Sequence, residues 1–555
     1  MKKIIVKLIV REVGLKINEV EDLVEVPPRG DMGDYAFPCF GLAKKLKSNP
    51  MKIAEDLVRK FRKDLPMEIS NVDSNGGYVN FFIDKKILAN NVLAKVNKKG
   101  FGENNFGKGK TVCIDMSSPN IAKPFGIGHL RSTIIGNSLG KIAEANGYHV
   151  VKINYLGDWG TQFGKIIFAY KKWGDEKKLK ADAIGHLQKL YVKVSADKVY
   201  DDGARAEFKK LEFGDEENLK LWENFRKLSI GKFDEIYDLL GISFDVVSGE
   251  SLYNDKMDVV VEELKKKKLL KKDDGALIVD LKTEGLGVAL IQKSDGTSLY
   301  VTRDLAAVKD RKEKYKFDKM IYEVGQEQKL HFRQLFKILE KMDYGWYKDC
   351  VHVAHGLYLG DGGKKFSTRK GKTVYMEDIL IEVIDKAKKN LLTRENIAKK
   401  ELEERARKIA LAAIFYGDLK NNRENNMIFN VDNFLSFEGD TGPYLLYSYA
   451  RANSIIKKVK SKKIVRVVDL KDSEIGLLKK INSFGDVVVR AYENLAPNLI
   501  ANYSFELAQM FNEFYHSCPV LGSIGEGFRL KLVDAFRVTL KKSLDLLGIG
   551  VLEEM

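Results

Sequence analysis

The sequence predicts a central α/β domain with a parallel sheet, a small α+β domain before it and an all-α bundle after it. From Thr111 the segments read strand (TVCIDM), turn (SSPNIAKPFGIG), helix and strand (YHVVKINYLG), which is the order of a βαβ unit. Residues 1 to about 90 mix short helices with a strand-like segment at 77–84. The C-terminal third, from about Glu377, has helical periodicity almost throughout.

The composition of the chain excludes several classes of protein. The 555-residue chain has a net charge of +16, with 44% hydrophobic and 31% charged residues and 10 prolines. These values are typical of a soluble globular protein of two to four domains, and they exclude a single small binding module and bulk disorder. No apolar run approaches the ~20 residues of a membrane span. The positive charge favours a polyanionic partner, although a generally lysine-rich proteome would give the same charge.

The cysteines and histidines give no pattern of a metal site. Four cysteines lie far apart and form no C-x-x-C pair: Cys39, Cys113, Cys350 and Cys518. This spacing supports neither a disulfide framework nor a zinc ribbon, and a reducing cytoplasm is the expected location. His352 and His355 follow Cys350 closely, but alternate residues of a strand point to opposite faces, so Cys350 and His352 share a face that His355 leaves. We therefore expect no protein-held metal.

The remaining elements follow in order along the chain. The first residues, MKKIIVKLIVRE, indicate an amphipathic element rather than a secretion signal, because Lys7, Arg11 and Glu12 interrupt the apolar run. The Gly-rich segment 98–110 is the first domain boundary. Residues 175–240 indicate a helical insertion, after which strand signals return in GALIVDL, TSLYVTRDL, KMIYEVG and CVHVAHGLYL.

The turn from Ser117 to His129 is the first candidate site. Gly126 and Gly128 remove side chains just before a helix begins at about His129. The backbone can then approach a nucleotide, and the helix N-terminus offers free N–H groups to phosphate. The alternative is a tight βα turn with a capping histidine, and the turn alone favours that alternative.

A basic loop is the second candidate site. The segment Lys364 to Gly371, KKFSTRKG, places four cations around two hydroxyls after the strand VHVAHGLYL. Mobile cations in such a loop can close over a triphosphate and neutralise the charge of a leaving pyrophosphate. A charged hairpin tip on a lysine-rich surface is the alternative, and the loop alone does not decide between them.

The two segments in this order resemble the two signatures of class I aminoacyl-tRNA synthetases, and more specifically those of the arginyl-tRNA synthetase family. The likeness extends along the whole chain, through GDYAFP at 33–38, GGYVNFF at 76–82, YLGDWGTQFG at 155–164, SDGTSLYVTRDLAA at 294–307, VGQEQKLHFRQLF at 324–336, FEGDTGPYLLYSYAR at 437–451 and DAFR at 534–537. The resemblance implies three domains: a module for the outer corner of the tRNA at 1–95, a Rossmann-like catalytic domain at 108–376 with a helical insertion at about 175–250, and a helical anticodon-binding domain at 377–555.

The resemblance also implies how arginine is held. Its guanidinium presents five donors in fork geometry, which carboxylates match best. By likeness the carboxylates are Asp304 and Asp115, with Tyr300 beside the guanidinium. The positions that face the α-amino end are Asn120 and Gln328, and Ser117 is a further implied arginine-binding residue. Asp115 departs from the family, which usually has glutamate there. Asp304 could also be a helix cap after the strand SLYVTR, a role compatible with binding.

The nucleotide-binding positions depart from the family at one histidine. Gly126 stands where the H-x-G-H signature has its first histidine, whereas Gly128 and His129 keep the second half. The other signature has phenylalanine for methionine and threonine at the usual second lysine. The implied ATP-binding residues are Gly126, Gly128, His129, Lys365, Phe366 and Ser367. The implied catalytic groups are His129, Lys365, Arg369 and Lys123, and the implied cofactors are ATP and Mg²⁺. A neighbouring cation such as Lys123 or Arg369 is expected to replace the lost histidine.

For the nucleic acid, Tyr78 and Asn80 fall where the family's N-terminal module stacks on and hydrogen-bonds an exposed base. The alternative is a strand with an inward aromatic. Tyr444 and Arg451 fall in a long helix of the bundle, of which only one face can meet anticodon bases. DAFR, with Phe536 for the usual leucine, resembles the signature of the family's anticodon-binding domain.

These observations predict ATP-dependent ligation of L-arginine to tRNA(Arg) through arginyl-adenylate, by a monomer without membrane contact. Two alternatives remain. A cysteinyl-tRNA synthetase shares the helical C-terminal fold but would need a cysteine-rich zinc site. A catalytically impaired relative that only binds tRNA is suggested by Gly126.

Overall fold

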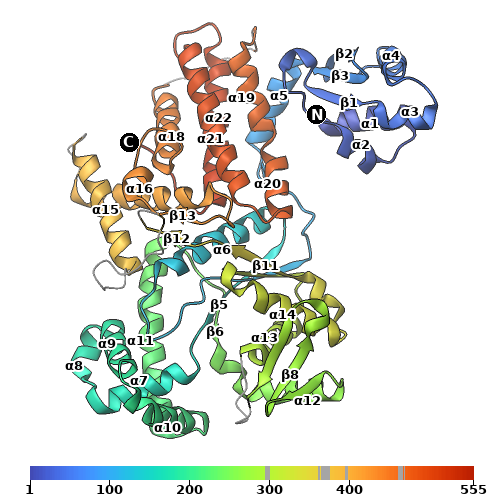
Figure 1. Cartoon of the computed structure of the whole chain (residues 1–555). Helices are drawn as coiled ribbons and strands as arrows, with labels where there is room; N and C mark the ends of the chain where they lie inside the picture. The colour runs from blue at the N-terminus through green and yellow to red at the C-terminus, as the bar shows by residue number, and fades with distance from the viewer. Residues whose placement is uncertain are drawn as a thin grey trace. The chain divides into compact units, whose positions relative to one another are not determined.

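The computed structural model describes residues 1–293, 300–360, 363, 375–393, 398–459, 465, 467 and 469–555, and of Tyr300 the backbone alone. The chain divides into two compact units (Figure 1). The first contains Met1–Phe101, Ala452–Phe484 and Leu507–Thr539. The second contains Gly102–Arg451, Gly485–Glu506 and Leu540–Met555.

The N-terminal part of the first unit is an α+β layer, as predicted. Its antiparallel sheet has the order β1-β3-β2. The strands are β1 (Tyr35–Pro38), β2 (Ile69–Asn75) and β3 (Tyr78–Ile83). The helices are α1 (Lys2–Val13), α2 (Ile17–Leu23), α3 (Phe40–Leu46), α4 (Pro50–Phe61) and α5 (Lys85–Val96), with a short 3-10 turn, η1 (Gly30–Met32). The amphipathic N-terminal segment is confirmed, because α1 buries one apolar face in this core.

Helical segments from the end of the chain complete the first unit. They are α19 (Asp472–Asn482) and parts of α18 (Gly442–Lys457), α21 (Asn498–Ser517) and α22 (Glu526–Leu546). Phe536 of the DAFR segment is fully buried, and its ring stacks on that of Phe511 at a centroid distance of 3.9 Å. A buried ion pair joins Arg529 Nε to Glu474 Oε1 at 2.8 Å.

The second unit is built on a five-stranded parallel sheet of order β11-β10-β4-β5-β6. The strands are β4 (Thr111–Asp115), β5 (His149–Leu156), β6 (Val246–Gly249), β10 (Lys319–Gly325) and β11 (Cys350–His355). All neighbouring pairs are parallel. The predicted βαβ unit is therefore confirmed, with α6 (Ile127–Ala145) joining β4 to β5.

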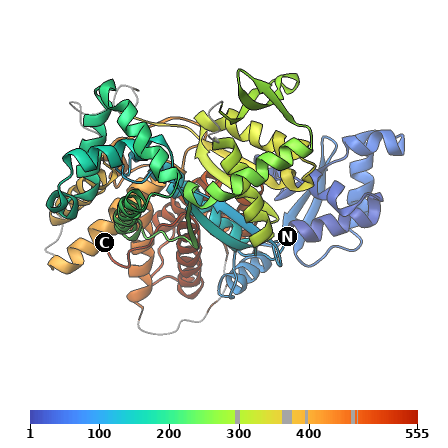
Figure 2. The same ribbon diagram turned by 90° about the horizontal axis from the view of Figure 1, so that it is seen from below.

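Helices cover both faces of this sheet (Figures 1 and 2). Helix α6 packs over β4, β5 and β10 on one face. On the other face, α12 (Met257–Lys266), α13 (Tyr300–Tyr315) and α14 (Lys329–Lys341) share a core with side chains of β4, β5 and β10. Burial on both faces accounts for the nearly continuous apolar character of strands such as β4.

The predicted helical insertion lies between β5 and β6. It consists of α7 (Thr161–Trp173), α8 (Glu176–Ala181), α9 (Ala183–Ser195), η2 (Lys198–Tyr200), α10 (Asp201–Glu212) and α11 (Glu216–Leu240). A separate antiparallel sheet, β7-β8-β9, follows α12. Its strands are β7 (Leu270–Asp273), β8 (Ala276–Leu281) and β9 (Gly287–Gln292). GALIVDL is therefore a strand, as predicted, but it belongs to this second sheet.

One predicted strand is wrong. TSLYVTRDL was expected to be extended, whereas helix α13 begins at Tyr300. The β-branched and aromatic residues of this segment gave a strand signal, but its burial follows a helix: Val301, Leu305 and Val308 are buried at a spacing of four and three. Asp304 therefore lies inside the helix, and the interpretation of Asp304 as a cap after a strand is wrong as well.

The rest of the second unit is mainly helical. Its elements include α15 (Met376–Leu392), α16 (Lys399–Leu419), α17 (Val431–Phe434), α20 (Phe484–Glu493) and two short paired strands, β12 (Tyr358–Leu359) and β13 (Met427–Ile428). The four cysteines are buried and free, which confirms that they form no disulfide. No described helix combines the length and apolar character needed to cross a membrane.

We expect Phe536→Ala to destabilise the first unit by about 3–5 kcal/mol, because the variant deletes a fully buried ring and leaves a cavity against Phe511. The measurement is the shift in the urea midpoint of the full-length chain, followed by hydrogen exchange of α21 and α22. Phe213→Ala is the matched control, because Phe213 is 80% exposed, and it should change stability by no more than about 0.5 kcal/mol. Equal effects of both variants would contradict the role of the stacked pair.

Candidate active site

The order of the strands places a site at one edge of the parallel sheet. The chain runs from β4 outward to β5 and β6, and then returns to the other side of β4 as β10. Crossover helices therefore leave β4 and β10 in opposite directions, and a crevice opens at the carboxyl ends of these two strands. Asp115 ends β4 and Gly325 ends β10. Most of the predicted substrate-binding residues follow these strand ends.

The loop between β4 and α6 has a strained backbone. Ser117, Ser118 and Ala122 have positive φ values of 71°, 50° and 56°. Non-glycine residues rarely adopt this conformation, and such residues concentrate at functional sites. Gly157 is needed beside the loop, because a Cβ there would lie 2.3 Å from Asn120 Oδ1. The fold thus holds Asn120 against the end of β5.

A buried hydrogen-bond network fixes the start of this loop. Ser117 Oγ lies 2.7 Å from Tyr237 OH, and Asn154 Nδ2 donates to the same hydroxyl at 3.0 Å. The Ser117 backbone N–H donates to Ser132 Oγ of α6 at 2.9 Å. Ser117 therefore joins the insertion, through Tyr237 of α11, to the five-stranded parallel sheet. The sequence predicted Ser117 as a ligand, and its hydroxyl already has protein partners.

Asp115 is held by a buried arginine. Its Oδ2 lies 2.7 Å from Arg311 Nη1, and its Oδ1 accepts from Ser118 Oγ at 2.9 Å. Burial raises the pKa of the Asp115 carboxyl, and the Arg311 guanidinium opposes that rise. The guanidinium also lies 4.9 Å from the ring centroid of Tyr155. Asp115 thus anchors α13 to the end of β4, and its carboxylate is already paired within the protein.

Asp304 occupies the centre of the charged groups. Its Oδ2 lies 2.6 Å from His331 Nε2 of α14. Burial raises the pKa of Asp115, Tyr155 and Glu250, and the negative charge of Asp304 adds to each rise, so all three lie within its electrostatic reach. Tyr155 OH is fully buried and has no hydrogen-bond partner among the described residues. A carboxylate therefore acts electrostatically on a buried hydroxyl that has no partner among the described residues.

Glu250 is a candidate site residue that sequence reasoning missed. It directly follows β6, whose carboxyl end meets the same sheet edge. Burial, aided by the charge of Asp304, raises its pKa to about 8, although Arg303 Nη1 lies 3.7 Å from its Oε2. The carboxyl groups of Asp304 and Glu250 therefore act on each other, and the pKa of Glu250 is raised. A bound cation would stabilise such a pair of carboxyl groups. The position of Glu250 just after a parallel strand was the available signal.

The turn at the start of α6 is open. Gly126 is the N-cap residue of α6, with φ −83° and ψ 159°. Among the described residues, a Cβ at Gly126 would meet only His129 Nδ1, at 3.9 Å, and one at Gly128 would meet no atom within 4 Å. The glycines therefore leave space at the helix start. Burial lowers the pKa of His129 to about 4, so its ring is neutral at pH 7 and can act only as a hydrogen-bond donor or acceptor.

Other predicted residues are placed as follows. Lys123 Nζ lies 5.3 Å from the ring centroid of Tyr191 in the insertion. Gln328 is exposed and ends the short turn η5 (Gln326–Gln328), just before α14. Five predictions lie outside the described residues: Lys365, Phe366, Ser367, Arg369 and the side chain of Tyr300.

A second buried network lies on the α6 face of the sheet. Arg131 of α6 pairs with Asp418 of α16, with Nε to Oδ1 at 3.1 Å, and Tyr358 also hydrogen-bonds to Asp418. Beside it, His355 Nδ1 lies 2.9 Å from Glu323 Oε1. His352 instead stacks on Phe332 of α14, at a centroid distance of 4.5 Å. The predicted separation of His352 and His355 to opposite faces is therefore confirmed.

In the parts of the chain that the structure describes, no group of three or more His, Cys, Asp and Glu side chains is arranged to hold a metal ion. The residues present thus show no built site for Mg²⁺.

The predicted tRNA-contacting residues have mixed exposure. Tyr78 of β3 is partly exposed and meets Phe40 edge to face at 5.3 Å, whereas Asn80 is buried. In α18, Arg451 stacks on exposed Tyr447 with its Cζ 4.7 Å from the ring centroid.

The other two tyrosines of α18 differ in burial. Tyr444 is half-buried against Phe505, whereas Tyr449 is fully buried. The expectation that only one face of this helix is available is confirmed by the burial of Tyr449.

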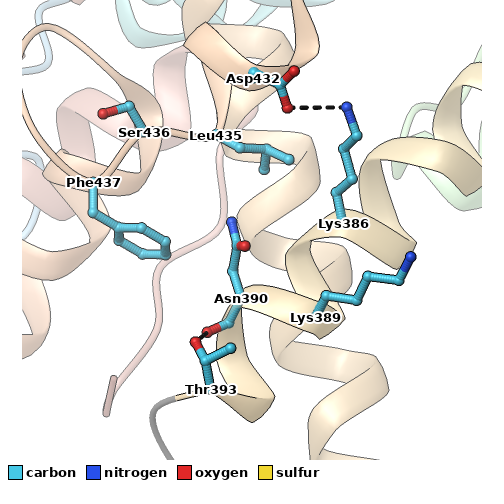
Figure 3. Close-up of a pocket in the computed structure, with 8 residues that line it drawn as sticks. All are labelled: Lys386, Lys389, Asn390, Thr393, Asp432, Leu435, Ser436 and Phe437. Carbon is cyan, nitrogen blue, oxygen red and sulfur yellow. Dashed lines mark hydrogen bonds and ion pairs between the residues drawn. The ribbon is translucent and has the colours of Figure 1, made fainter.

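Two cavities adjoin these elements. One, of about 670 Å³, lies beside the turn that precedes α6 and is lined by Phe125 and by residues of α9, α11 and α15. Another, of about 380 Å³, lies between α15 and the segment from Asp432 to Phe437 (Figure 3). There Lys386 Nζ pairs with Asp432 Oδ1 at 2.9 Å. None of the predicted site residues lines the second cavity.

Comparison with known proteins agrees with this architecture. The family model of the class I (R) tRNA synthetase catalytic domain matches residues 89–431. The DALR anticodon binding domain matches residues 445–555, and the arginyl tRNA synthetase N-terminal domain matches residues 1–83.

Whole-chain relatives give the same result. Arginine–tRNA ligases of Clostridium botulinum (strain Alaska E43 / Type E3) and Clostridium perfringens (strain 13 / Type A) are 45% and 44% identical, over 100% of both chains in each case. The Thermus thermophilus arginyl-tRNA synthetase structure has a TM-score of 0.84 at 24% identity, covering 100% of both chains. That of Plasmodium falciparum has a TM-score of 0.82 at 27% identity, covering 100% of this chain and 98% of the other. The chain therefore belongs to the class I arginyl-tRNA synthetase family.

Proposed function

We propose that the chain ligates L-arginine to tRNA(Arg). ATP and arginine first form arginyl-adenylate and pyrophosphate, and the arginyl group then passes to the terminal adenosine of the tRNA, initially to its 2′ hydroxyl. The observation that carries this proposal is the pair of carboxyl groups, Asp304 and Glu250, at the carboxyl edge of the parallel sheet in a chain of this family.

The charge balance of the site favours a guanidinium as ligand. Asp304 and Glu250 repel each other, and burial makes ionisation of Glu250 unfavourable. A bound guanidinium would supply the missing positive charge and several donors in one plane. Tyr155 OH, which is buried and unpartnered, offers a further acceptor. Asn120 and Gln328 are the proposed partners of the amino-acid end, and Tyr300 that of the guanidinium.

For ATP, we propose that the open helix start at Gly126 and Gly128 admits the nucleotide backbone. His129 then contributes a hydrogen bond rather than a charge, since its ring is neutral at pH 7. Lys123, Lys365 and Arg369 are the proposed cations. Mg²⁺ would enter with the ATP phosphates and lower their negative charge. No protein nucleophile is needed, because positioning and charge stabilisation suffice for adenylate formation.

For the tRNA, we propose that residues 1–95 hold its outer corner, residues 108–376 carry the chemistry, and residues 377–555 read the anticodon. The pair of partly exposed Tyr78 and exposed Phe40 offers a stacking surface for a base. Tyr444 and Arg451 share one face of α18, at a spacing of seven residues. The family assignment is incompatible with the cysteinyl alternative. An impaired tRNA-binding relative would bind tRNA without arginine-dependent chemistry, so an activity assay separates the two functions.

We expect Asp304→Asn to weaken arginine activation by about 2–5 kcal/mol, because the neutral amide leaves the substrate guanidinium without its charged partner. The measurement is kcat/KM for arginine in pyrophosphate exchange with tRNA present, together with the tRNA dissociation constant, which should not change. Glu313→Gln is the matched control, because this exposed carboxylate lies on the same helix. Exchange at the wild-type rate in Asp304→Asn would contradict the arginine site.

We expect Tyr78→Ala to raise the KM for tRNA by a factor equivalent to about 1–3 kcal/mol, the usual value of stacking on one base, with little change in the KM for arginine. Tyr78→Phe keeps the ring and should retain nearly all of the affinity. Aminoacylation kinetics of the two variants provide the measurement. If Tyr78→Ala charges tRNA with the wild-type KM, the N-terminal sheet does not stack on a base through this residue.

A further inference from the structure

The buried pair of Glu323 and His355 lies at the same sheet edge as the candidate active site. Glu323 is near the end of β10 and His355 ends β11, and the register places His355 opposite Gly325. His355 Nδ1 and Glu323 Oε1 are 2.9 Å apart, and both side chains are buried. The carboxylate therefore fixes the orientation of the imidazole ring, so that Nε2 points away from Glu323.

Helix α6 covers the face on which this pair lies. Ser132 Oγ of α6 donates to the carbonyl oxygen of Glu323 at 2.6 Å. His352 packs against α14 on the opposite face, so His355, an odd number of residues further along β11, faces α6. Ser132 is one turn of helix beyond His129 and two turns beyond Gly126. The pair thus lies beneath the start of α6, where the phosphates of a nucleotide would approach.

The ring of His355 has one nitrogen available. The fully buried polar atoms without a partner include His129 Nδ1 and Glu323 Oε2, but His355 Nε2 is not among them. Among the described residues none forms a hydrogen bond with His355 Nε2, and 8% of the His355 side chain is exposed. A Cβ at Gly325 would lie 3.8 Å from this nitrogen, an ordinary contact, and 2.9 Å from Glu327 Oε2.

The pKa values of His355 and His129 are shifted in opposite directions by their surroundings. Glu323 raises the pKa of His355 against the opposing effect of burial, whereas burial lowers the pKa of His129 to about 4. The positive charge of His355 itself contributes to that lowering, so the two rings are close. Arg131 and Asp418 also act on His355, with opposite signs. Of these two histidines, His355 is therefore the one whose pKa is raised and whose protonated form is favoured.

We propose that His355, oriented by Glu323, donates from Nε2 to the ATP phosphates and supplies the contact that glycine at position 126 cannot make. This inference rests on the proposed function, because it assigns a residue to adenylate formation. It also differs from the sequence-based expectation that Lys123 or Arg369 compensates. In the reaction, the donor stabilises negative charge on the phosphates as pyrophosphate leaves, and no bond to His355 is formed.

The central experiment combines removal of His355 with restoration of the family histidine. Pyrophosphate exchange with tRNA present would be measured for wild type, Gly126→His, His355→Gln and the double variant. We expect His355→Gln to lower kcat by about 10²–10³-fold, as for loss of one preorganised donor. In the His355→Gln background, Gly126→His should raise the exchange rate at least tenfold. In the wild-type background, Gly126→His should change the exchange rate by less than about threefold, because the new histidine duplicates a contact that His355 already makes.

A second variant serves as a control for effects on folding. His355→Gln leaves Glu323 buried without its partner, whereas His355→Phe with Glu323→Leu replaces both groups by apolar side chains and avoids that cost. The apolar pair should fold but show the same loss of exchange and the same rescue. His352→Gln is the matched control on the other face of the strand, and it should exchange at the wild-type rate. Wild-type exchange by the folded apolar pair, or equal acceleration by Gly126→His in every background, would overturn the proposal.

The pH profile gives a readout that a purely structural role would not change. The pKa of His355 is raised, so the protonated form and its contribution are present at low pH and are lost as pH rises through that pKa. Exchange should therefore fall on the alkaline side. Glu323→Gln should move this limb to lower pH. Groups that act on the same ring are His129 and Arg131 from α6, Asp418 from α16 and His352 from β11. An unshifted limb in Glu323→Gln would contradict the assignment.

Failure of this inference is distinguishable from failure of the proposed function. If wild type shows arginine-dependent exchange and the His355 variants match it, only the inference fails. If wild type shows no exchange, the proposed function fails, and the dissociation constant of ATP alone then decides the inference. A value at least tenfold weaker in the apolar-pair variant supports a phosphate contact by His355, and an unchanged value overturns it.

Discussion

The reversal of strand order at β4 and β10 is the constraint on which the rest of the site depends. Because neighbouring strands are parallel, their carboxyl ends meet at one edge. Because the chain leaves β4 and β10 in opposite directions, no crossover covers that edge. Residues separated by some 200 positions are brought together there without any local sequence signal. The strained loop after β4 and the helix start at Gly126 both follow from this arrangement.

Buried charge is the second feature that organises the site. The carboxylate of Asp115 is balanced by Arg311, and that of Asp304 is held by His331, whereas Glu250 retains a raised pKa. Burying an uncompensated charge is costly, so such groups persist where a ligand completes the balance. The same reasoning applies on the opposite face of the sheet, where Glu323 and His355 form a pair beneath α6.

Much of the fold could be predicted from sequence, because the periodicity of the apolar residues and the lengths of the segments were unambiguous. The βαβ unit at Thr111, the insertion and the C-terminal helices have strong periodic signals. The segment around Tyr300 failed because its residue types favour a strand while its burial pattern is helical, and tertiary packing decided the outcome. Gly126 and Asp304 could be identified as site candidates from motifs alone. Glu250 had only the signal of following a strand, and the pair of Glu323 and His355 had none, because their meaning arises from the register of strands distant in sequence.

The most direct test of the central claim is the amino-acid dependence of pyrophosphate exchange by the unmodified chain. Each of the twenty amino acids would be supplied in turn with ATP, Mg²⁺ and tRNA(Arg). Our account requires that arginine alone supports rapid exchange, because only its guanidinium can satisfy the carboxylates of Asp304 and Glu250 together. Exchange that is absent with arginine, or equally rapid with lysine, would contradict the account.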